Sequence, residues 1–308
     1  MNIFRNAWGW LYNEPHQLIG VRVIQICIGV ALLFQLFTEL PFATYLWGPK
    51  GIGWGSTQPV LGPALGSLFD LIFTRNAGVF CVLFVLGLGA LGLVFGYVTR
   101  IATLLVLVAV FLLSQRLPEI TDGGDNITRI VLIYMLFLLP HRNRVSAGKL
   151  RVWLHNIAVL AIFMQIIVMY ASSGFAKAMG EMWQQGVAMY YITQVQWFTL
   201  PGIHQLFMNP LIVTVTTYVP MFYQLLFPIA TISRLKIPWI LLGICFHLGI
   251  MILMGLITFS WIMIGLELFF ISDQEYAMIW NNVLRLWEKF PGIPRTTFSE
   301  KVKREKVS

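Results

Sequence analysis

Long apolar runs recur from about residue 18 to residue 272 and constrain the fold more than any other feature of this sequence. A helix needs roughly 20 apolar residues to cross the hydrocarbon core of a bilayer. Of the 308 residues, 58% are hydrophobic and 11% are charged. The pattern predicts an all-α protein, a polytopic bundle of about eight transmembrane helices. The expected spans are residues 18–40, 77–98, 101–116, 128–140, 153–176, 210–232, 237–256 and 258–272.

Basic residues gather in residues 141–151, in residues 233–236 and after residue 284. Because Lys and Arg stay on the cytoplasmic side of membrane proteins, an even number of spans with both termini cytoplasmic fits all three segments. We therefore expect a multi-pass protein of the cell (inner or cytoplasmic) membrane, surrounded by membrane lipids. The net charge of +8 then reflects topology and not nucleic-acid binding. The predicted divisions are a cytoplasmic N-terminal segment 1–17, a transmembrane helical domain 18–272 and a basic cytoplasmic tail 273–308.

Two long connections fall on the outer side in this topology. Residues 41–76 are rich in Gly, Pro and aromatic residues, and residues 177–209 begin with an amphipathic stretch of Trp, Tyr and Gln. Such residues favour ordered segments at the level of the lipid headgroups. We expect both connections to roof a cavity that opens to the outside.

Lys177 stands at the predicted outer end of the span 153–176. Tyr170 and Ser173 precede it at helical spacing, so the three side chains share one face, and Gly174 allows close approach of another helix. Desolvation favours a neutral amine, which can act as a base. Two alternatives remain open: the lysine reaches the headgroups, or it pairs with Glu181 one turn further on.

His247 and Glu267 lie inside apolar runs, which makes each a candidate functional residue. The structural alternative for His247 is a hydrogen bond between helices. Glu267 needs a partner or a proton, and the sequence does not identify that partner. We assign His247 with Lys177 to the candidate catalytic group and Glu267 to the supporting polar group.

Further polar residues cluster at the same predicted outer side. Glu39 ends the first span, and Asp125, Asn126 and Arg129 stand at the start of the fourth, where Asp125 or Asn126 could cap the helix. The three cysteines lie in apolar runs without metal-ligand spacing, so no metal site is predicted. Walker, Rossmann, HExxH and nucleophile-elbow motifs are missing from the sequence.

Several segments in order resemble the horizontally transferred transmembrane (HTTM) family, whose best-known members are the vitamin K-dependent γ-glutamyl carboxylases. They are Tyr-Leu-Trp-Gly-Pro-Lys-Gly at 45–51, DGGDNITRIVLIYMLF from 122, YASSGFAKAMGEMWQQG at 170–186 and FHLGIMILMGLITFSWIMI at 246–264. The likeness covers about residues 18–272. It is closest to short bacterial members such as the sporulation-delaying-protein B-like proteins, which are needed to mature a secreted peptide toxin.

The resemblance implies roles for particular residues. Lys177, followed by Glu181 and Trp183, matches the carboxylase lysine that deprotonates a reduced quinone of the vitamin K or menaquinone type. His247 falls in a Phe-His element that the family shares. Ala176 replaces a first lysine of the family motif, and Asp125-Asn126-Ile127 lacks the histidine of the corresponding carboxylase element. The animal enzymes carry a large lumenal region after the spans, whereas about 35 residues follow the last predicted span in this sequence.

Three functional hypotheses follow. The first is a carboxylase-like lyase, or a related quinone-coupled enzyme, that modifies or matures a secreted peptide at an outward-facing site. The second is a non-catalytic assembly or immunity factor for such a peptide, working with an accessory membrane or exported protein. The third is a transporter, which the buried charges alone favour.

Overall fold

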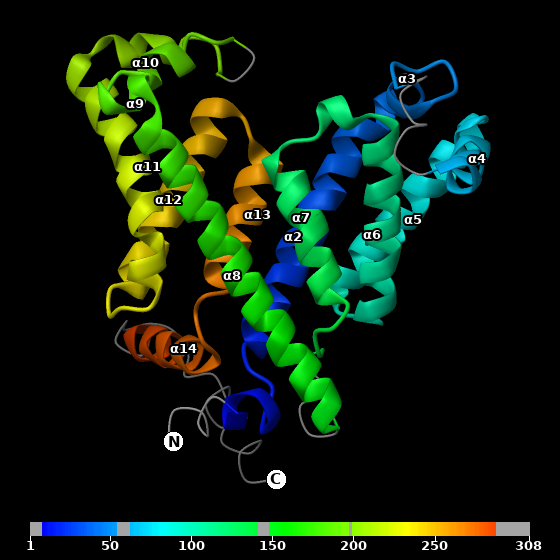
Figure 1. The fold of residues 1–308 in the computed structure, drawn as a ribbon, viewed down its shortest axis with the longest axis horizontal. Coiled ribbons are helices and arrows are strands. Elements are labelled where there is room, and N and C mark those ends of the chain that lie inside the picture. The colour runs from blue at the N-terminus through cyan, green and yellow to red at the C-terminus, as the bar shows by residue number, and fades with distance from the viewer. Residues whose placement is uncertain (1–7, 54–61, 141–147, 197–198, 288–308) are drawn as a thin grey trace.

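The computed structural model describes residues 8–53, 62–140, 148–196 and 199–287, and these residues form helices joined by turns. Figure 1 shows the long helices running side by side, with α9 and α10 at one end of the bundle and α14 at the other. The long helices are α2 (Leu18–Glu39), α5 (Asn76–Phe95), α6 (Thr99–Arg116), α8 (Lys149–Met179), α11 (Pro210–Thr231) and α12 (Lys236–Met254). The shorter ones are α3 (Ala43–Trp47), α4 (Gly62–Phe73), α7 (Gly123–Met135), α9 (Glu181–Gln184), α10 (Ala188–Ile192), α13 (Ile257–Leu268) and α14 (Asp273–Trp287).

Each of the eight predicted spans overlaps a helix, and the described residues contain no strand, so the all-α prediction is confirmed for them. Within the described ranges six helices are long and apolar enough to cross a membrane, or seven if α13 and α14 count as one bent span. The protein is therefore a multi-pass membrane protein. α7 and α13, with 13 and 12 residues, extend only about 20 Å at 1.5 Å per residue. A total of eight crossings and the orientation of the termini stay predictions.

The fourth predicted span, 128–140, is displaced along the sequence. α7 occupies Gly123–Met135 because Asp122 and Asp125 form a reciprocal capping box that starts the helix. The Asp122 carboxylate accepts from the Asp125 N–H at 2.9 Å, and the Asp125 carboxylate accepts from the Asp122 N–H at 2.9 Å. Hydropathy located the apolar residues, whereas capping set the boundary.

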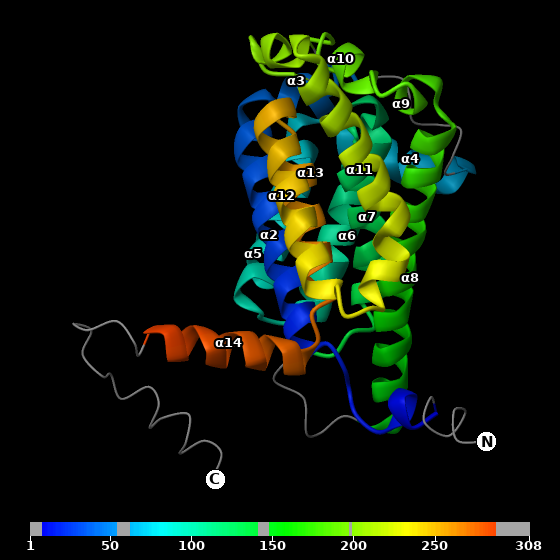
Figure 2. The same ribbon diagram turned by 90° about the vertical axis from the view of Figure 1, so that its left-hand side faces the viewer.

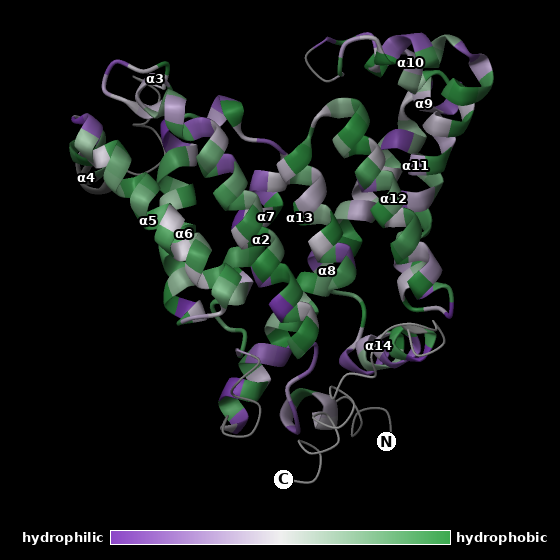
Figure 3. Ribbon diagram, turned by 180° about the vertical axis from the view of Figure 1, so that it is seen from behind, coloured by the Kyte–Doolittle hydropathy of each residue, from purple (hydrophilic) through white to green (hydrophobic). Residues whose placement is uncertain are grey.

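Small residues bring the first helices of the bundle together. A Cβ atom on Gly29 of α2 would lie 2.8 Å from the Ala90 carbonyl oxygen of α5, closer than normal packing permits. Arg22 of α2 donates to the Leu93 and Val94 carbonyls, which lie at the C-terminal end of α5. In the ribbon of Figure 3 the hydrophobic colour predominates along the helices, and hydrophilic residues are more frequent near the two ends of the bundle. This is the distribution expected for helices that meet lipid on their outer faces.

The segment before α2 folds back on the start of α8. The Asn156 amide donates to the carbonyls of Trp10 at 3.0 Å and Glu14 at 2.9 Å, and accepts from the His16 N–H at 3.1 Å. His155 is fully buried, and its Nδ1 accepts from the Leu139 N–H at 2.9 Å. These contacts hold the segment from Trp10 to His16 at the end of the bundle where α14 lies.

Candidate functional site

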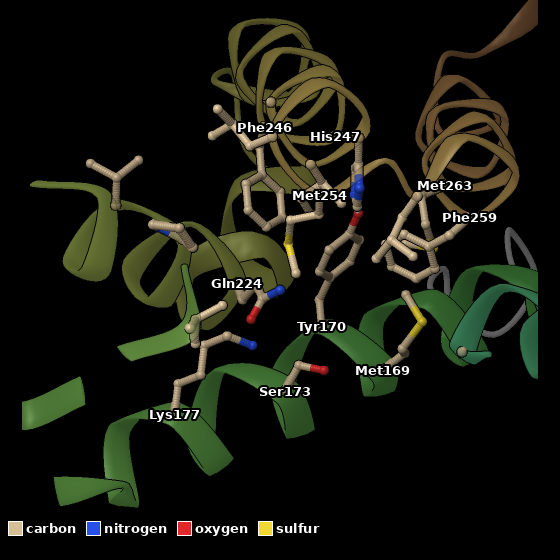
Figure 4. A pocket seen from close by; sticks show the side chains of 18 of the residues that line it. Met169, Tyr170, Ser173, Lys177, Gln224, Phe246, His247, Met254, Phe259 and Met263 are labelled. Atoms are coloured by element: carbon tan, nitrogen blue, oxygen red, sulfur yellow. The ribbon is translucent and has the colours of Figure 1, made fainter. Parts of the chain in front are cut away.

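A cavity of about 780 Å³ lies between α7, α8, α11, α12 and α13, with Trp183 of α9 and Met189 of α10 on its wall at one end. Its lining is mostly aliphatic, aromatic and methionine side chains, interrupted by a few polar groups. Figure 4 shows Lys177, Ser173 and Tyr170 from one helix extending toward Gln224 and His247 from two others. A pocket of this size and character suits an apolar or amphipathic ligand.

α8 positions three of the predicted residues along the cavity. Tyr170, Ser173 and Lys177 all line it, as their helical spacing predicts. Gly174, beside them, faces α11, where an added Cβ would lie 2.7 Å from the Leu225 backbone nitrogen. The small residue therefore lets α8 and α11 approach closely at the height of the cavity.

Lys177 does not form the predicted alternative pair with Glu181. α8 ends at Met179, and Gly180, with ψ 127°, turns the chain away before Glu181. The Glu181 carboxylate instead accepts from the Gln185 amide at 2.9 Å. The Lys177 ammonium lies 5.2 Å from the centroid of the Trp183 ring, and no described carboxylate forms a salt bridge with it. Its amine therefore meets an aromatic face within a largely apolar cavity.

A buried polar cluster forms the wall deeper in the bundle. The hydroxyls of Tyr170 and Tyr223 donate to the same Glu267 oxygen, Oε1, at 2.6 and 2.7 Å. His247 Nε2 lies 2.8 Å from the Tyr170 hydroxyl and 3.4 Å from Glu267 Oε1. His247 is 1% exposed and Glu267 is 0% exposed. The tyrosines therefore supply the partners that the carboxylate needs away from water.

Hydrogen-bond accounting indicates how protons are placed in the cluster. The Tyr170 hydroxyl has one proton, which it donates to Glu267, so it accepts the proton of His247 Nε2–H. In the neutral ring, Nδ1 is then an acceptor, and no described group bonds to it. Glu267 Oε2 and Gln224 Oε1 also have no hydrogen-bond partner in the described ranges. The cluster thus retains unused hydrogen-bonding capacity beside the cavity.

Gly243 of α12 makes space for this cluster. A Cβ atom at this position would lie 2.1 Å from the Tyr223 hydroxyl oxygen and 2.3 Å from Glu267 Oε1. Sequence reasoning missed Gly243, Tyr223 and Gln224. The available signal was the adjacent pair Tyr223-Gln224 inside an apolar run, since polar side chains at membrane depth are expensive unless they are paired.

The remaining predicted residues lie at the same end of the bundle as Lys177, but of these only Asn126 lines the large cavity. Asn126 lines the large cavity, and Arg129 links the Asn126 amide oxygen at 3.1 Å to the Ser114 hydroxyl at 3.0 Å. Asp125 belongs to the capping box. Glu39 accepts from the Gln35 amide at 3.1 Å and, with Asp125, lines a different cavity of about 40 Å³. The structure therefore brings Asn126 to Lys177 but leaves Glu39 and Asp125 apart from it.

Of the two connections predicted to cover the cavity, only one does so. Residues from 177–209 line the large cavity, but none of the described residues of 41–76 does. Arg116 holds the latter connection over α6 by donating to the carbonyls of Trp47 at 3.3 Å and Gly48 at 2.9 Å. Because these contacts anchor the connection 41–76 on the opposite side of the bundle, it does not cover the cavity as predicted. Over the described ranges, no group of three or more potential metal-ligating side chains occurs.

Comparison with known proteins finds two relatives, both from Bacillus subtilis (strain 168). The chain is 24% identical to the uncharacterized protein YitO over 189 residues, which are 55% of this chain and 60% of YitO. It is 26% identical to the sporulation-delaying protein SdpB over 182 residues, which are 53% of this chain and 56% of SdpB. The chain thus spans somewhat more than half the length of each relative. No family model matches it, and no solved structure does.

The comparison supports a distant SdpB-like relationship over about half of the chain. The wider resemblance to the HTTM family and its carboxylases stays a prediction. The functional roles of the residues that line the cavity are therefore proposed from their geometry.

Proposed function

We propose that this protein matures a secreted peptide by a covalent modification carried out at the 780 Å³ cavity, with Lys177 as the base. The observation that carries the proposal is the position of Lys177, on a largely apolar wall with no described carboxylate bound to it. An amine without an anionic partner is available to accept a proton from a bound substrate. The distant similarity to SdpB supports a role in peptide maturation.

The other polar groups have distinct proposed tasks. His247 would accept a proton from a bound ligand at its free Nδ1 atom, and the nearby Glu267 would then balance the charge on the ring. Gln224 and Ser173, on the same wall as Lys177, orient the polar end of a ligand. The deeper methionine and aromatic side chains exclude water from the reaction.

A reduced quinone fits this cavity better than a polar cofactor does. Aromatic and methionine side chains such as Phe246, Phe259 and Met263 would enclose an apolar ring and tail, and Lys177 with Gln224 would meet the polar ring substituents. When bound, its oxidation by dioxygen would supply the free energy that drives modification of a peptide glutamate. The residues of this chain would bind it, keep water out and accept a proton at Lys177 Nζ.

The proposed topology has eight crossings in the cell membrane, with the Lys177 end facing outward. Basic residues stand at the N-terminal ends of α8 and α12, the ends far from Lys177: they are Lys149, Arg151 and Lys236. The positive-inside rule places such residues on the cytoplasmic side. A secreted peptide then meets the cavity after it has crossed the membrane. An accessory membrane or exported protein would present it.

The test compares the wild type with three variants of the chain in cells that also express and export a candidate substrate peptide. Lys177→Gln removes the amine, whereas Lys177→Arg keeps a cation that cannot act as a base. Ser172→Ala, at an exposed position on the same helix, is the matched control. We expect the peptide to gain mass with the wild-type and control chains and with neither Lys177 variant, at equal membrane levels.

Other outcomes separate the alternatives. Modification that persists in Lys177→Gln would contradict the role of Lys177 as base. A peptide that is exported or tolerated only when this chain is present, but whose intact mass never changes, would favour a non-catalytic assembly or immunity factor.

A further inference from the structure

α14 leaves the bundle almost at a right angle to the preceding helix. The axes of α13 and α14 differ by 98°. A capping box starts α14 at this turn: Glu275 Oε2 accepts from both the N–H and the hydroxyl of Ser272 at 2.7 Å, and the Ser272 hydroxyl accepts from the Glu275 N–H at 3.3 Å. Figure 2 shows α14 extending sideways from the end of the bundle.

Three further contacts fix α14 in this orientation. The Asp273 carboxylate caps the start of α2 by accepting from the N–H groups of Leu18 at 3.0 Å and Ile19 at 2.8 Å. Lys236, the first residue of α12, pairs with Glu275 at 2.6 Å. The Tyr276 hydroxyl donates to the Leu268 carbonyl at 2.8 Å. The direction of α14 is therefore set by α2, α12 and α13 together.

α14 has one apolar face and one polar face. At 100° per residue, Tyr276 shares an arc with apolar side chains further along, and Gln274, Asn281, Asn282 and Arg285 lie opposite. Beyond Tyr276 this face is uncovered in the structure, with Trp280 55% exposed and Leu286 57% exposed. The apolar arc comprises Tyr276, Ile279, Trp280, Val283, Leu284 and Leu286.

Tyr276 shows which way the apolar face points. It packs against the core of the bundle, and its hydroxyl reaches the end of α13. The face that continues from Tyr276 along α14 is therefore directed toward the side of the membrane-crossing helices. α2 and α12 begin at this end, so it marks a boundary between the hydrocarbon and the aqueous phase.

We propose that α14 is an interfacial helix that binds the surface of the phospholipid bilayer. Its apolar arc lies at the boundary of headgroups and acyl chains, and its Asn and Arg face is in water. Trp280 suits the headgroup level because its ring is amphipathic. The occupant of this face is lipid, because a helix that extends sideways at the end of the spans meets the bilayer before any partner. This inference does not depend on the proposed function.

Single-cysteine labelling tests the proposal on the full chain in nanodiscs of phosphatidylcholine with phosphatidylglycerol. Cys27 is buried, so replacing the exposed Cys81 and Cys245 by Ala removes the reactive native thiols. Ile279→Cys and Val283→Cys report on the apolar arc, with Asn281→Cys and Asn282→Cys as matched controls on the polar face. Each thiol is labelled with bimane and exposed to iodide in the buffer or to spin-labelled lipid.

We expect spin-labelled lipid to quench positions 279 and 283 several-fold more strongly than 281 and 282, and iodide to show the opposite order. Lipid quenching at all four positions would indicate that α14 crosses the membrane. Shielding of 279 and 283 from both quenchers would indicate a protein partner or a second copy. Iodide quenching at all four would place α14 in water, and each of these three results would overturn the proposal.

Discussion

α2 meets α5 at Gly29 with backbone atoms nearly in contact, whereas α8, α11, α12 and α13 surround a cavity of about 780 Å³. In the first half of the bundle the cavity that Glu39 lines has a volume of only about 40 Å³. Small residues allow backbones to approach in both regions, at Gly29 between α2 and α5 and at Gly174 between α8 and α11, but the second group of helices also encloses a space lined by aromatic and methionine side chains. One half of the bundle is thus a close-packed scaffold, and the other half is a chamber.

The comparison also shows where polar groups are tolerated. In the scaffold, Arg22 and Arg116 bond to backbone carbonyls at helix ends and in a connection. In the chamber half, side chains bond to one another around Glu267. A buried cluster of this kind depends on every member, because each lost partner leaves a polar group unsatisfied. The chamber should therefore be more sensitive to small changes at its polar wall than to changes on its open side.

The largest expected effect concerns α12, which has one glycine at the polar wall of the cavity and another on its open side. Gly243→Ala places a methyl group against Tyr223 and Glu267, and we expect a loss of about 3 kcal/mol or more in stability. Gly249→Ala on the same helix meets nothing within 4 Å and should be neutral or stabilising. Unfolding of both variants in detergent measures the difference. Equal losses would refute the distinction between the two sides of α12.

The second prediction concerns the scaffold. Gly29→Ala forces α2 away from α5, and we expect a loss of about 2 kcal/mol. Gly87→Ala on α5 meets only a methyl group of Leu36 at 3.2 Å, which can move, so it serves as the control. The same unfolding measurement applies. A Gly29 variant as stable as the wild type would show that the α2–α5 interface is not closely packed.

The third prediction ranks the two tyrosines of the chamber. Tyr170→Phe removes a donor to Glu267 and the partner of His247, whereas Tyr223→Phe removes only a donor to Glu267. We expect losses of about 2 and about 1 kcal/mol, respectively. Phe227→Leu, an apolar change in the same core, controls for altered packing. A larger loss in Tyr223→Phe would reverse the proposed order of the cluster.

The smallest expected effect is a pH dependence of stability at Glu275 of α14, which lies outside both halves of the bundle. Burial alone would raise the pKa of Glu275, but hydrogen bonds from Lys236 and Ser272 outweigh it and leave the pKa lowered. A lowered pKa stabilises the fold above the ordinary pKa of a glutamate, and this stabilisation is lost as the pH falls through the lowered value. We expect the wild type to lose more thermal stability than Glu275→Gln between pH 6 and pH 3. Parallel pH profiles would show that the pair does not contribute.

Hydropathy predicted most of the fold because crossing a bilayer requires long apolar helices with their backbone groups bonded internally. It located all eight helical segments, and it marked His247 and Glu267 because ionisable residues are rare there. Helical spacing placed Tyr170, Ser173 and Lys177 on one face. The errors arose where capping or distant anchoring decided the outcome, at the start of α7 and at residues 41–76.

The sequence by itself therefore determined the class of the protein, the position of its helices and several polar residues that must have partners. Only the tertiary structure decided which partners they have. Glu267 meets Tyr170 and Tyr223 because α8, α11 and α13 pack together, and Gly243 of α12 leaves the space for them. Lys177 turns to Trp183 because α8 ends before Glu181. Such contacts join residues far apart in the chain, and local pattern contains no information about which helices become neighbours.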